Sequence, residues 1–394
     1  MSPAKNLLVM QSGGPTPVIN RSLFGVCDEA AKSGAFAGIF GAHGGVEGVL
    51  GDRVFDLAAI STASWRAIAV APGAALGTTR KKFSDSELPR VIDFIKRREI
   101  THWLIIGGND SASTALTVGT AAKDAGRDLK VLLVPKTVDN DLVGTDHSPG
   151  YGSAARFVAA ATQGAGRDAE AMGPAAPITV IEVAGRDSGW LAAASVLGKR
   201  DSRDAPHVVV TPEMGFDPSG VLSGIESAYR RYGFAVAVIQ ENVRDQHGRP
   251  LVGDGKPFHV DDFGNEYHEG AGQHLTRFVT DRLKVRVRYD RPGTIQRSMA
   301  ELVSSVDAQE AEEVGRAAVR HALDGETNRM VSIVRVGDNP YASETGLTSL
   351  EPVGGAHKTM PAEFLDSEGM PTGVFLDYAL PLIGDPLPTF GRID

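Results

Sequence analysis

Short apolar runs alternate with amphipathic segments along the first third of the chain. The run Leu7–Met10 leads into a Gly-rich turn and then into a helical pattern over about 17–32. A capping pair, Ser84 with Glu87, precedes a second segment in which apolar residues recur with helical spacing. The continuous apolar runs Trp103–Ile106 and Val131–Val134 are typical of strands buried on both faces. This alternation of strand-like and helical segments predicts a parallel sheet with helices on both faces.

In the second third of the chain, strand-like and helical segments alternate again, which predicts a second α/β unit. Its strand-like runs lie at Ile178–Val183, His207–Val210 and Phe234–Ile239, with helical patterns near 191–198 and 220–232. Residues 243–272 are rich in Gly, Asp and His without periodicity, which indicates a surface insertion. A helix over about 307–323 and a strand over 330–336 follow, and the last fifty residues are rich in Pro and Gly.

We therefore expect an α/β fold made of two doubly wound parallel-sheet domains. The first domain is expected at 1–150, completed by about 296–330, and the second at 151–295 with the insertion at about 243–272. Residues 331–394 are expected to form a C-terminal strand and a wrapping extension.

Composition and net charge exclude several classes of protein. The net charge of -9 argues against a general nucleic-acid or membrane-surface binder, which needs a broad basic field. The longest apolar runs fall far short of the ~20 residues of a membrane helix, and the N-terminal one is too short for a signal peptide. The single cysteine, Cys27, excludes an intrachain disulfide framework. We expect a cytoplasmic protein that binds neither nucleic acid nor membranes.

Two turns at predicted strand ends carry candidate chemistry. Residues 11–15, Gln-Ser-Gly-Gly-Pro, offer backbone N–H groups and a helix N-terminus to a phosphate, although a tight packing turn is an equal alternative. Residues 135–141, Pro-Lys-Thr-Val-Asp-Asn-Asp, place one cation and two carboxylates after a buried strand. Asp139 could accept a proton from a hydroxyl, Asp141 could hold magnesium or orient its neighbour, and Lys136 could neutralise a transferring phosphoryl group. The alternative without a catalytic role is a solvated loop with a local ion pair.

The order of these motifs resembles that of the phosphofructokinase family. Ser-Gly-Gly at 12–14 and Gly-Gly-Asn-Asp at 107–110 precede the 135–141 segment. Glu-Val-Ala-Gly-Arg at 182–186 resembles the family's sugar-phosphate motif, and Gly-Thr-Ile-Gln-Arg at 293–297 resembles its later Gly-His-Ile-Gln-Arg motif. The resemblance covers about 7–336. It implies the phosphofructokinase fold, with the active site in the cleft between the two domains, and a homodimer or homotetramer.

The resemblance also implies roles for individual residues. Asp139 would be the base that takes the proton from the sugar 1-hydroxyl, and magnesium would be held with Asn109 and Asp141. Donor phosphates would contact Gly13, Gly14, Arg80 and Ser111. Fructose 6-phosphate would be bound by Thr137, Val138, Asp139, Ala184, Gly185, Arg186, Glu241, Arg288, Thr294 and Arg297.

Two positions resemble the pyrophosphate-dependent branch of the family. Asp110 stands where ATP-dependent members usually have glycine, so its charge would repel an α-phosphate. Lys136 likewise stands where ATP-dependent members have a small residue. Its cation would bind pyrophosphate, which is a short donor. The resemblance therefore implies reversible phosphoryl transfer from pyrophosphate to fructose 6-phosphate, with Asp139, Lys136 and Asp110 as the catalytic set.

Several departures leave alternatives open. Asn109 replaces the usual Asp, which removes a charge at magnesium. Ala184 and Thr294 replace larger residues, so sedoheptulose 7-phosphate is an alternative sugar. Pro177 stands where many relatives carry an arginine that crosses the subunit boundary. Rival functions are an ATP-dependent 6-phosphofructokinase, a non-catalytic sugar-phosphate sensor and a nicotinamide oxidoreductase, and the last lacks its glycine fingerprint.

Overall fold

The computed structural model of the chain describes residues 5–251, 259–260, 266–267 and 270–393. The chain divides into two compact units. The first comprises Met1–Ser153 and Arg297–Lys358, and the second comprises Ala154–Gln296 and Thr359–Asp394. Over the described residues, no helix has the length and apolarity needed to cross a membrane.

The first unit is built on a seven-stranded sheet with the order β13-β12-β5-β4-β1-β2-β3. The five strands from β12 to β2 run parallel, and β13 and β3 are antiparallel edges. The strands are β1 (Asn6–Gln11), β2 (Gly38–Ala42), β3 (Val54–Asp56), β4 (Ile100–Gly107), β5 (Lys130–Pro135), β12 (Arg329–Asp338) and β13 (Tyr341–Ser349).

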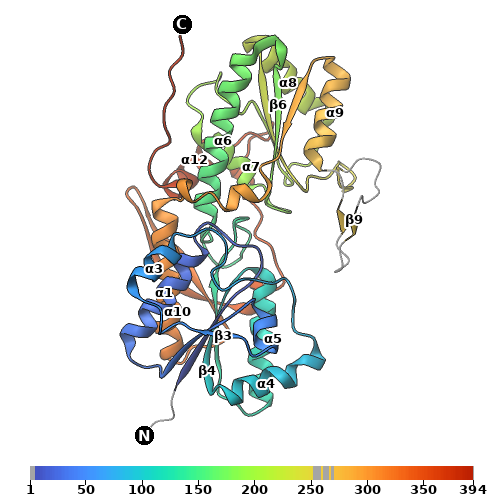
Figure 1. The fold of residues 1–394 in the computed structure, drawn as a ribbon. Coiled ribbons are helices and arrows are strands. Elements are labelled where there is room, and N and C mark those ends of the chain that lie inside the picture. The colour runs from blue at the N-terminus through green and yellow to red at the C-terminus, as the bar shows by residue number, and fades with distance from the viewer. Residues whose placement is uncertain (1–4, 252–258, 261–265, 268–269, 394) are drawn as a thin grey trace. The chain divides into compact units, whose positions relative to one another are not determined.

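Helices cover both faces of this sheet (Figure 1). They are α1 (Ile19–Ser33), α2 (Val46–Leu50), α3 (Thr62–Ala69), α4 (Leu88–Arg97), α5 (Asn109–Asp124), α10 (Ser305–Leu323) and α11 (Leu350–Val353). Successive strand residues point to opposite faces. Leu8 and Met10 accordingly pack in the core that includes α4 and α5, whereas Leu7 and Val9 pack in the core that includes α1 and α10. The continuous apolar runs of the sequence are thus explained by burial on two sides.

The second unit contains a four-stranded parallel sheet with the order β11-β6-β8-β7. Its strands are β6 (Ile178–Val183), β7 (Val208–Val210), β8 (Ala235–Gln240) and β11 (Val287–Asp290). Apolar residues of α8 (Pro218–Tyr232) and α9 (Ala271–Leu283) pack against β6, β7 and β8 in one core. Shorter elements are α7 (Trp190–Ala194), α12 (Gly373–Ala379) and a two-stranded sheet of β9 (His259–Val260) with β10 (Glu266–Tyr267). The long helix α6 (Tyr151–Met172) begins at the end of the first unit and continues in the second.

The expected α/β fold class is confirmed, and so are most of the expected elements. The capping box at Ser84 and Glu87 is present and precedes α4, and the helix expected over 307–323 is α10. Among the elements that the sequence patterns did not predict are β2, β3, β11, β13, α3, α6 and α9, and several of these are short or partly exposed. Most of the expected insertion at 243–272 lies outside the described residues. The strand that was expected to open a C-terminal extension, β12, pairs with β5 inside the first sheet.

Candidate functional site

The candidate donor residues follow three neighbouring parallel strands of the first unit. β5, β4 and β1 are adjacent in the sheet, so their carboxyl ends meet at one edge. Backbone hydrogen bonds continue past the strand ends, from Ser12 N–H to Ile106 O at 3.0 Å and from Lys136 N–H to Gly107 O at 3.0 Å. The sheet order therefore brings together three turns that are far apart in the sequence.

The Gly13–Gly14 turn lies against two cationic side chains. The buried Lys136 ammonium donates to Gly14 O at 2.7 Å. Gly13 has φ of +76°, a left-handed conformation that favours glycine, and a Cβ added there would lie 3.3 Å from Lys136 Nζ. A Cβ added at Gly14 would lie 2.2 Å from Nη1 of Arg297. A side chain at position 14 would thus displace the Arg297 guanidinium from this turn.

The N-terminus of α5 supplies the second part of this edge. Asn109, Asp110 and Ser111 form its first turn, and the Gly107 backbone approaches Ser111 so closely that a Cβ at 107 would lie 2.1 Å from its Oγ. The Asp110 carboxylate pairs with Lys82 Nζ at 2.6 Å, and both side chains are exposed. The sequence analysis assigned a role to Arg80, which is exposed, and none to Lys82.

The loop between β5 and α6 carries Asp139, and hydrogen bonds join the first half of this loop to its second half. Asp139 N–H donates to Thr137 Oγ1 at 3.1 Å, and Thr137 N–H donates to Pro149 O at 3.2 Å. The buried side chain of Asn140, which has φ of +55°, accepts from Ser148 N–H at 3.1 Å. The segments 136–141 and 145–150 are therefore two joined limbs of one loop, which we call the catalytic loop.

Asn109, Asp141 and His357 form a triangle of polar side chains. Asn109 Nδ2 lies 2.9 Å from Asp141 Oδ2 and 3.1 Å from His357 Nδ1, and His357 Nδ1 lies 3.1 Å from the same carboxylate oxygen. Asn109 Oδ1 is buried and has no hydrogen-bond partner among the described residues. The sequence analysis did not find His357, because it lies 216 residues beyond Asp141 and no motif marks it.

Lys358 is a second residue of this site that sequence reasoning missed. Its ammonium donates to Asp146 O at 2.6 Å and lies 3.3 Å from Thr145 O and 3.4 Å from Asn140 Oδ1. Burial lowers the pKa of Lys358 to about 8, although the carboxylates of Asp146 and Asp141 act in the opposite direction. This lysine holds both limbs of the catalytic loop from the segment that follows α11.

The candidate sugar-phosphate turn lies in the second unit, after β6. Glu241 Oε1 accepts from the backbone N–H groups of Gly185 and Arg186, each at 3.3 Å, and Ala184 N–H lies 3.3 Å from Gln296 Oε1. Gly185 has φ of +135°, and a Cβ there would lie 2.5 Å from the Gln240 amide. The Arg186 side chain is exposed.

A buried carboxylate lies beside this turn and was not predicted. Glu182 accepts from Gly272 N–H at 2.8 Å and from the Tyr289 hydroxyl at 3.1 Å, and it pairs with Arg291 Nε at 2.9 Å. Burial raises the pKa of Glu182, while the charge of Arg291 opposes the rise. Arg291 Nη2 also lies 3.9 Å from Glu241, so this arginine links the two carboxylates.

The other predicted sugar ligands of the second unit are less enclosed. Arg288, on β11, pairs with Asp168 of α6, and Thr294 is exposed. The predicted residues thus fall into two groups, one in each unit. The group in the first unit contains Gly13, Gly14, Arg80, Asn109, Asp110, Ser111, Lys136, Thr137, Val138, Asp139, Asp141 and Arg297. The group in the second unit contains Ala184, Gly185, Arg186, Glu241, Arg288 and Thr294.

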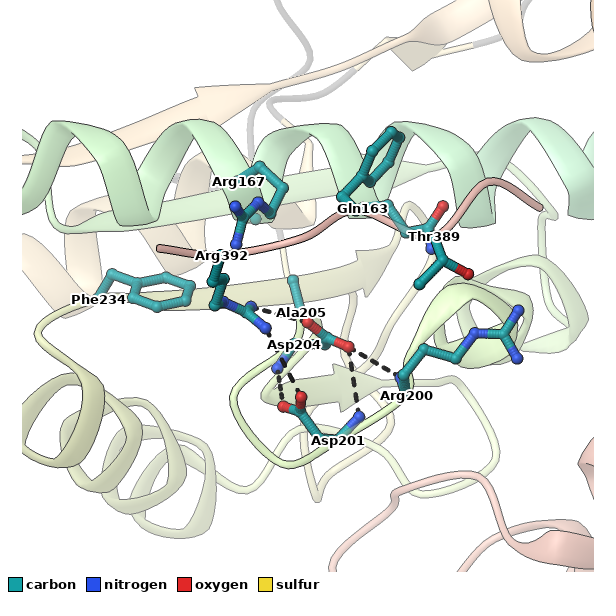
Figure 2. Close-up of a pocket in the computed structure, with 11 residues that line it drawn as sticks. Gln163, Arg167, Arg200, Asp201, Asp204, Ala205, Phe234, Thr389 and Arg392 are labelled. Carbon is teal, nitrogen blue, oxygen red and sulfur yellow. Dashed lines mark hydrogen bonds and ion pairs between the residues drawn. The ribbon is translucent and has the colours of Figure 1, made fainter. Parts of the chain in front are cut away.

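A separate pocket of the second unit contains none of these residues (Figure 2). α6, the 200–205 loop and the C-terminal segment line it. Arg392 of that segment pairs with Glu170 at 3.0 Å and with Asp204 at 2.8 Å, and Arg167 donates to Gly391 O at 2.7 Å. These contacts fasten the end of the chain to α6.

Comparisons with known proteins agree with the resemblance seen in the sequence. A family model described as "Phosphofructokinase" matches residues 6–322. The pyrophosphate–fructose 6-phosphate 1-phosphotransferase of Rhodospirillum rubrum is 38% identical over 393 residues, which cover 98% of this chain and 96% of that protein. The enzyme of the same name from Halomonas elongata is 34% identical and is matched over 98% of this chain and 93% of its own length. The crystal structure of the pyrophosphate-dependent phosphofructokinase from Nitrosospira multiformis superposes with a TM-score of 0.88, at 32% identity, covering 98% of this chain and 94% of that one.

Proposed function

This chain belongs to the phosphofructokinase family. From that premise we propose that it transfers a phosphoryl group from inorganic pyrophosphate to the 1-hydroxyl of fructose 6-phosphate, giving fructose 1,6-bisphosphate and phosphate. The observation that carries the proposal is the Lys136 ammonium, which lies buried against the Gly13–Gly14 turn. A fixed cation beside a glycine turn suits a small, highly charged donor that has no nucleoside to add binding energy.

Asp110 supports pyrophosphate over ATP as the donor. One unit-charge repulsion at ~4 Å and an effective dielectric constant of ~20 costs about 4 kcal/mol, which is roughly a thousandfold in binding. The ion pair with Lys82 reduces this repulsion, but both partners are exposed and such pairs are weak. A nucleotide α-phosphate at this position would therefore still be disfavoured.

The proposed reaction is a direct in-line transfer. Asp139 accepts the proton of the sugar 1-hydroxyl, the Lys136 cation neutralises charge on the transferring group beside the Gly13–Gly14 turn, and no covalent enzyme intermediate forms. The transfer exchanges one phosphoanhydride for one phosphoester, so we expect it to run in both directions.

Asn109 and Asp141 are the residues that would hold Mg²⁺. The unpaired Asn109 Oδ1 and the neighbouring Asp141 carboxylate fit a cation that prefers oxygen ligands. Among the described residues, no group of three or more His, Cys, Asp or Glu side chains could hold a metal by itself. Donor oxygens and water would therefore complete the coordination. When bound, the ion would neutralise charge on the phosphates.

The sugar phosphate is assigned to the turn at 184–186 and to the arginines. The 6-phosphate would be bound by Arg186, Arg288 and Arg297. Glu241 would accept hydrogen bonds from the sugar hydroxyls, and the sugar would also contact Thr137 and Thr294. In the family, the counterpart of Arg288 often reaches a neighbouring subunit, so we propose a homodimer or homotetramer.

An assay of the purified protein with each donor tests the proposal. We expect turnover with pyrophosphate and Mg²⁺, and little or none with ATP. The same assay with sedoheptulose 7-phosphate tests whether the small side chains of Ala184 and Thr294 admit a longer sugar. Turnover with ATP and none with pyrophosphate would refute the donor assignment, and no turnover with either donor would favour a sugar-phosphate sensor.

The variant Asp110→Gly tests the electrostatic reason for the choice. Removal of this carboxylate should raise kcat/KM for ATP by at least about tenfold, because the repulsion of the α-phosphate disappears. Asp93→Gly is not a suitable control, since glycine inside α4 would weaken that helix. Asp128→Asn, which removes an exposed carboxylate outside the helices of the first unit, should leave ATP use unchanged.

A further inference from the structure

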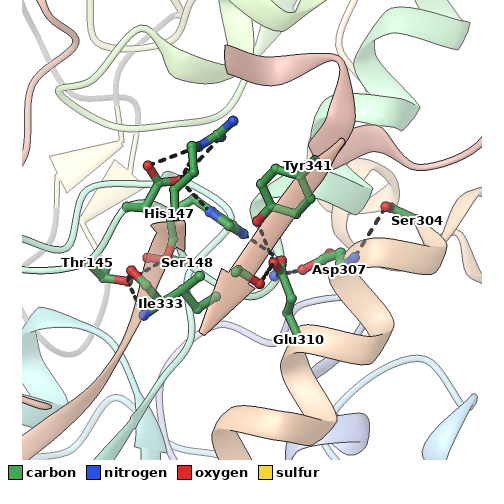
Figure 3. Close-up of polar contacts among 12 residues, drawn as sticks. Thr145, His147, Ser148, Ser304, Asp307, Glu310, Ile333 and Tyr341 are labelled. Carbon is green, nitrogen blue, oxygen red and sulfur yellow. Dashed lines mark hydrogen bonds and ion pairs between the residues drawn. The ribbon is translucent and has the colours of Figure 1, made fainter. Parts of the chain in front are cut away.

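His147 lies in the second limb of the catalytic loop and is completely enclosed. Its side chain is 1% exposed. Nδ1 lies 2.8 Å from Asp146 Oδ2, and Nε2 lies 2.6 Å from Glu310 Oε2 of α10 (Figure 3). The sequence analysis assigned no role to this residue or to Glu310, which follows it by 163 positions.

The two contacts require two protons on the ring. A neutral imidazole donates from one nitrogen and accepts at the other, whereas an ionised carboxylate can only accept. Only an imidazolium can donate to both carboxylates at once. Burial alone would lower the pKa of His147, but Glu310 and Asp146 outweigh it and raise the pKa to about 9.

Further charged or titratable groups surround the pair from several elements. Tyr341 and Ser343 of β13 donate to the second oxygen of Glu310 at 2.5 and 2.7 Å, so this carboxylate is fixed from α10 and β13 together. Arg335 of β12 pairs with Asp146 at 3.3 Å. The groups that face His147 or its two carboxylates are Asp146, Asp307, Glu310, Arg335, Tyr341 and Lys358.

The anchored limb is joined to the limb that carries Asp139. Ser148 N–H, next to His147 in the chain, donates to the Asn140 side chain, and Asn140 lies between Asp139 and Asp141. His147 O also accepts from Thr145 Oγ1 at 2.8 Å. At the far end of the limb, Asp307 of α10 accepts from Gly150 N–H at 2.8 Å. A displacement of His147 would therefore reach the proposed base through the hydrogen bond between Ser148 and Asn140.

We propose that His147 acts as a buried cationic positioning residue: its contact with Asp146 fixes the ring within the catalytic loop, its contact with Glu310 holds the loop on α10, and the two together place Asp139 for proton transfer. Loss of the second proton breaks one of the two contacts and leaves a carboxylate buried without its partner. The attachment of the loop to α10 through Glu310 is then weakened, although the Asp307–Gly150 hydrogen bond remains, and kcat falls while binding of the substrates changes little.

The test uses the full-length protein and the variant Glu310→Gln. In ¹⁵N-histidine-labelled wild type, NMR should show one histidine that carries protons on both nitrogens at pH 7.5 and loses one only near pH 9. With pyrophosphate and fructose 6-phosphate, kcat should decline along an alkaline limb with the same midpoint. Glu310→Gln removes one of the two carboxylates, so both midpoints should move to lower pH by about one unit, with KM within about twofold.

Ser343→Ala is the matched control. It removes a hydrogen bond from the same Glu310 carboxylate without changing a charge, so both midpoints should stay within about 0.3 pH units. A role in stability alone would lower the melting temperature of Glu310→Gln and leave its kcat profile in place, which would overturn the proposal. So would the absence of a doubly protonated histidine at pH 7.5. The kinetic measurement depends on the proposed function, whereas the NMR titration does not, so the failure of one is distinguishable from the failure of the other.

Discussion

The catalytic loop of the first unit and the sugar-phosphate turn of the second unit hold their functional groups in different ways. The loop is fixed by buried contacts, such as those of Asn140 with Ser148 and of His147 with Glu310. In the second unit the backbone of the turn is fixed by Glu241, but the Arg186 side chain and Thr294 are exposed.

The difference suits the roles that we propose for the two regions. A base contributes only when its position is set within fractions of an ångström before the substrate arrives, and buried hydrogen bonds provide that placement. Arginines that bind a phosphate can remain solvated until the ligand supplies the counter-charge. We therefore expect substitutions in the loop to lower kcat, and substitutions around the turn to raise KM.

Asp139→Asn should have the largest effect. The amide has the same size but cannot take up the hydroxyl proton, so kcat should fall about a thousandfold with little change in KM for either substrate. Steady-state kinetics measure this, and circular dichroism checks the fold. Asp128→Asn, which changes an exposed carboxylate of the same unit, is the control and should keep full activity. An unimpaired Asp139→Asn variant would remove the base from the mechanism.

The stability of the protein should fall as the pH rises from about 6.5 to about 9. The pKa of His147 is raised on folding from 6.5 to about 9, so its stabilisation is complete below pH 6.5 and is lost as the pH rises through the folded-state value. The loss should be on the order of 3 kcal/mol. Urea unfolding at fixed protein concentration across this range measures it. The total loss across this range should be smaller in Glu310→Gln, because a smaller rise in the His147 pKa narrows the pH window, and an equal loss in the two proteins would contradict the assignment.

Lys136→Met should lower kcat/KM for pyrophosphate about a hundredfold. Methionine fills much the same space against the Gly13–Gly14 turn but carries no charge to neutralise the donor. Lys123→Met, at an exposed position on α5, is the matched control and should behave as wild type. Equal losses in the two variants would show that Lys136 has no special relation to the donor.

Arg291→Ala should have the smallest effect of the four and should act on the sugar. Its removal leaves the buried Glu182 without a charged partner and frees Glu241, so KM for fructose 6-phosphate should rise about tenfold while kcat is largely kept. The exposed Arg230, on α8, provides the control Arg230→Ala. A fall in kcat with unchanged KM would contradict the division between the loop and the turn.

Much of the fold could be predicted because its signal is local. The two faces of the first sheet appear in the sequence as continuous apolar runs, and the capping pair before α4 is only three residues apart. Edge strands were missed because burial on one side leaves only a weak pattern: Val287–Asp290, for example, is partly exposed throughout. The helix α9 was missed because the sequence before it has no hydrophobic periodicity and offers no strong start signal.

The candidate site was predictable only where its residues lie within motifs. Glycines, Lys136 and the loop carboxylates stand in short segments at strand ends, and their chemistry can be inferred from residue type. His357, Lys358 and Arg291 have no such marker, and each gains a role only through a partner that is distant in the sequence. The ion pair between Asp110 and Lys82 was likewise not foreseen.

The sequence by itself determined the buried strands of both sheets, the turns at their carboxyl ends and the residue types that suit phosphoryl transfer, because these depend on local periodicity and side-chain chemistry. Only the tertiary structure decided that His147 lies between Asp146 and Glu310 and that Lys358 reaches the catalytic loop. The physical reason is that the charge of a buried group depends on what encloses it. That enclosure is made by elements which the chain topology brings together from positions more than a hundred residues apart.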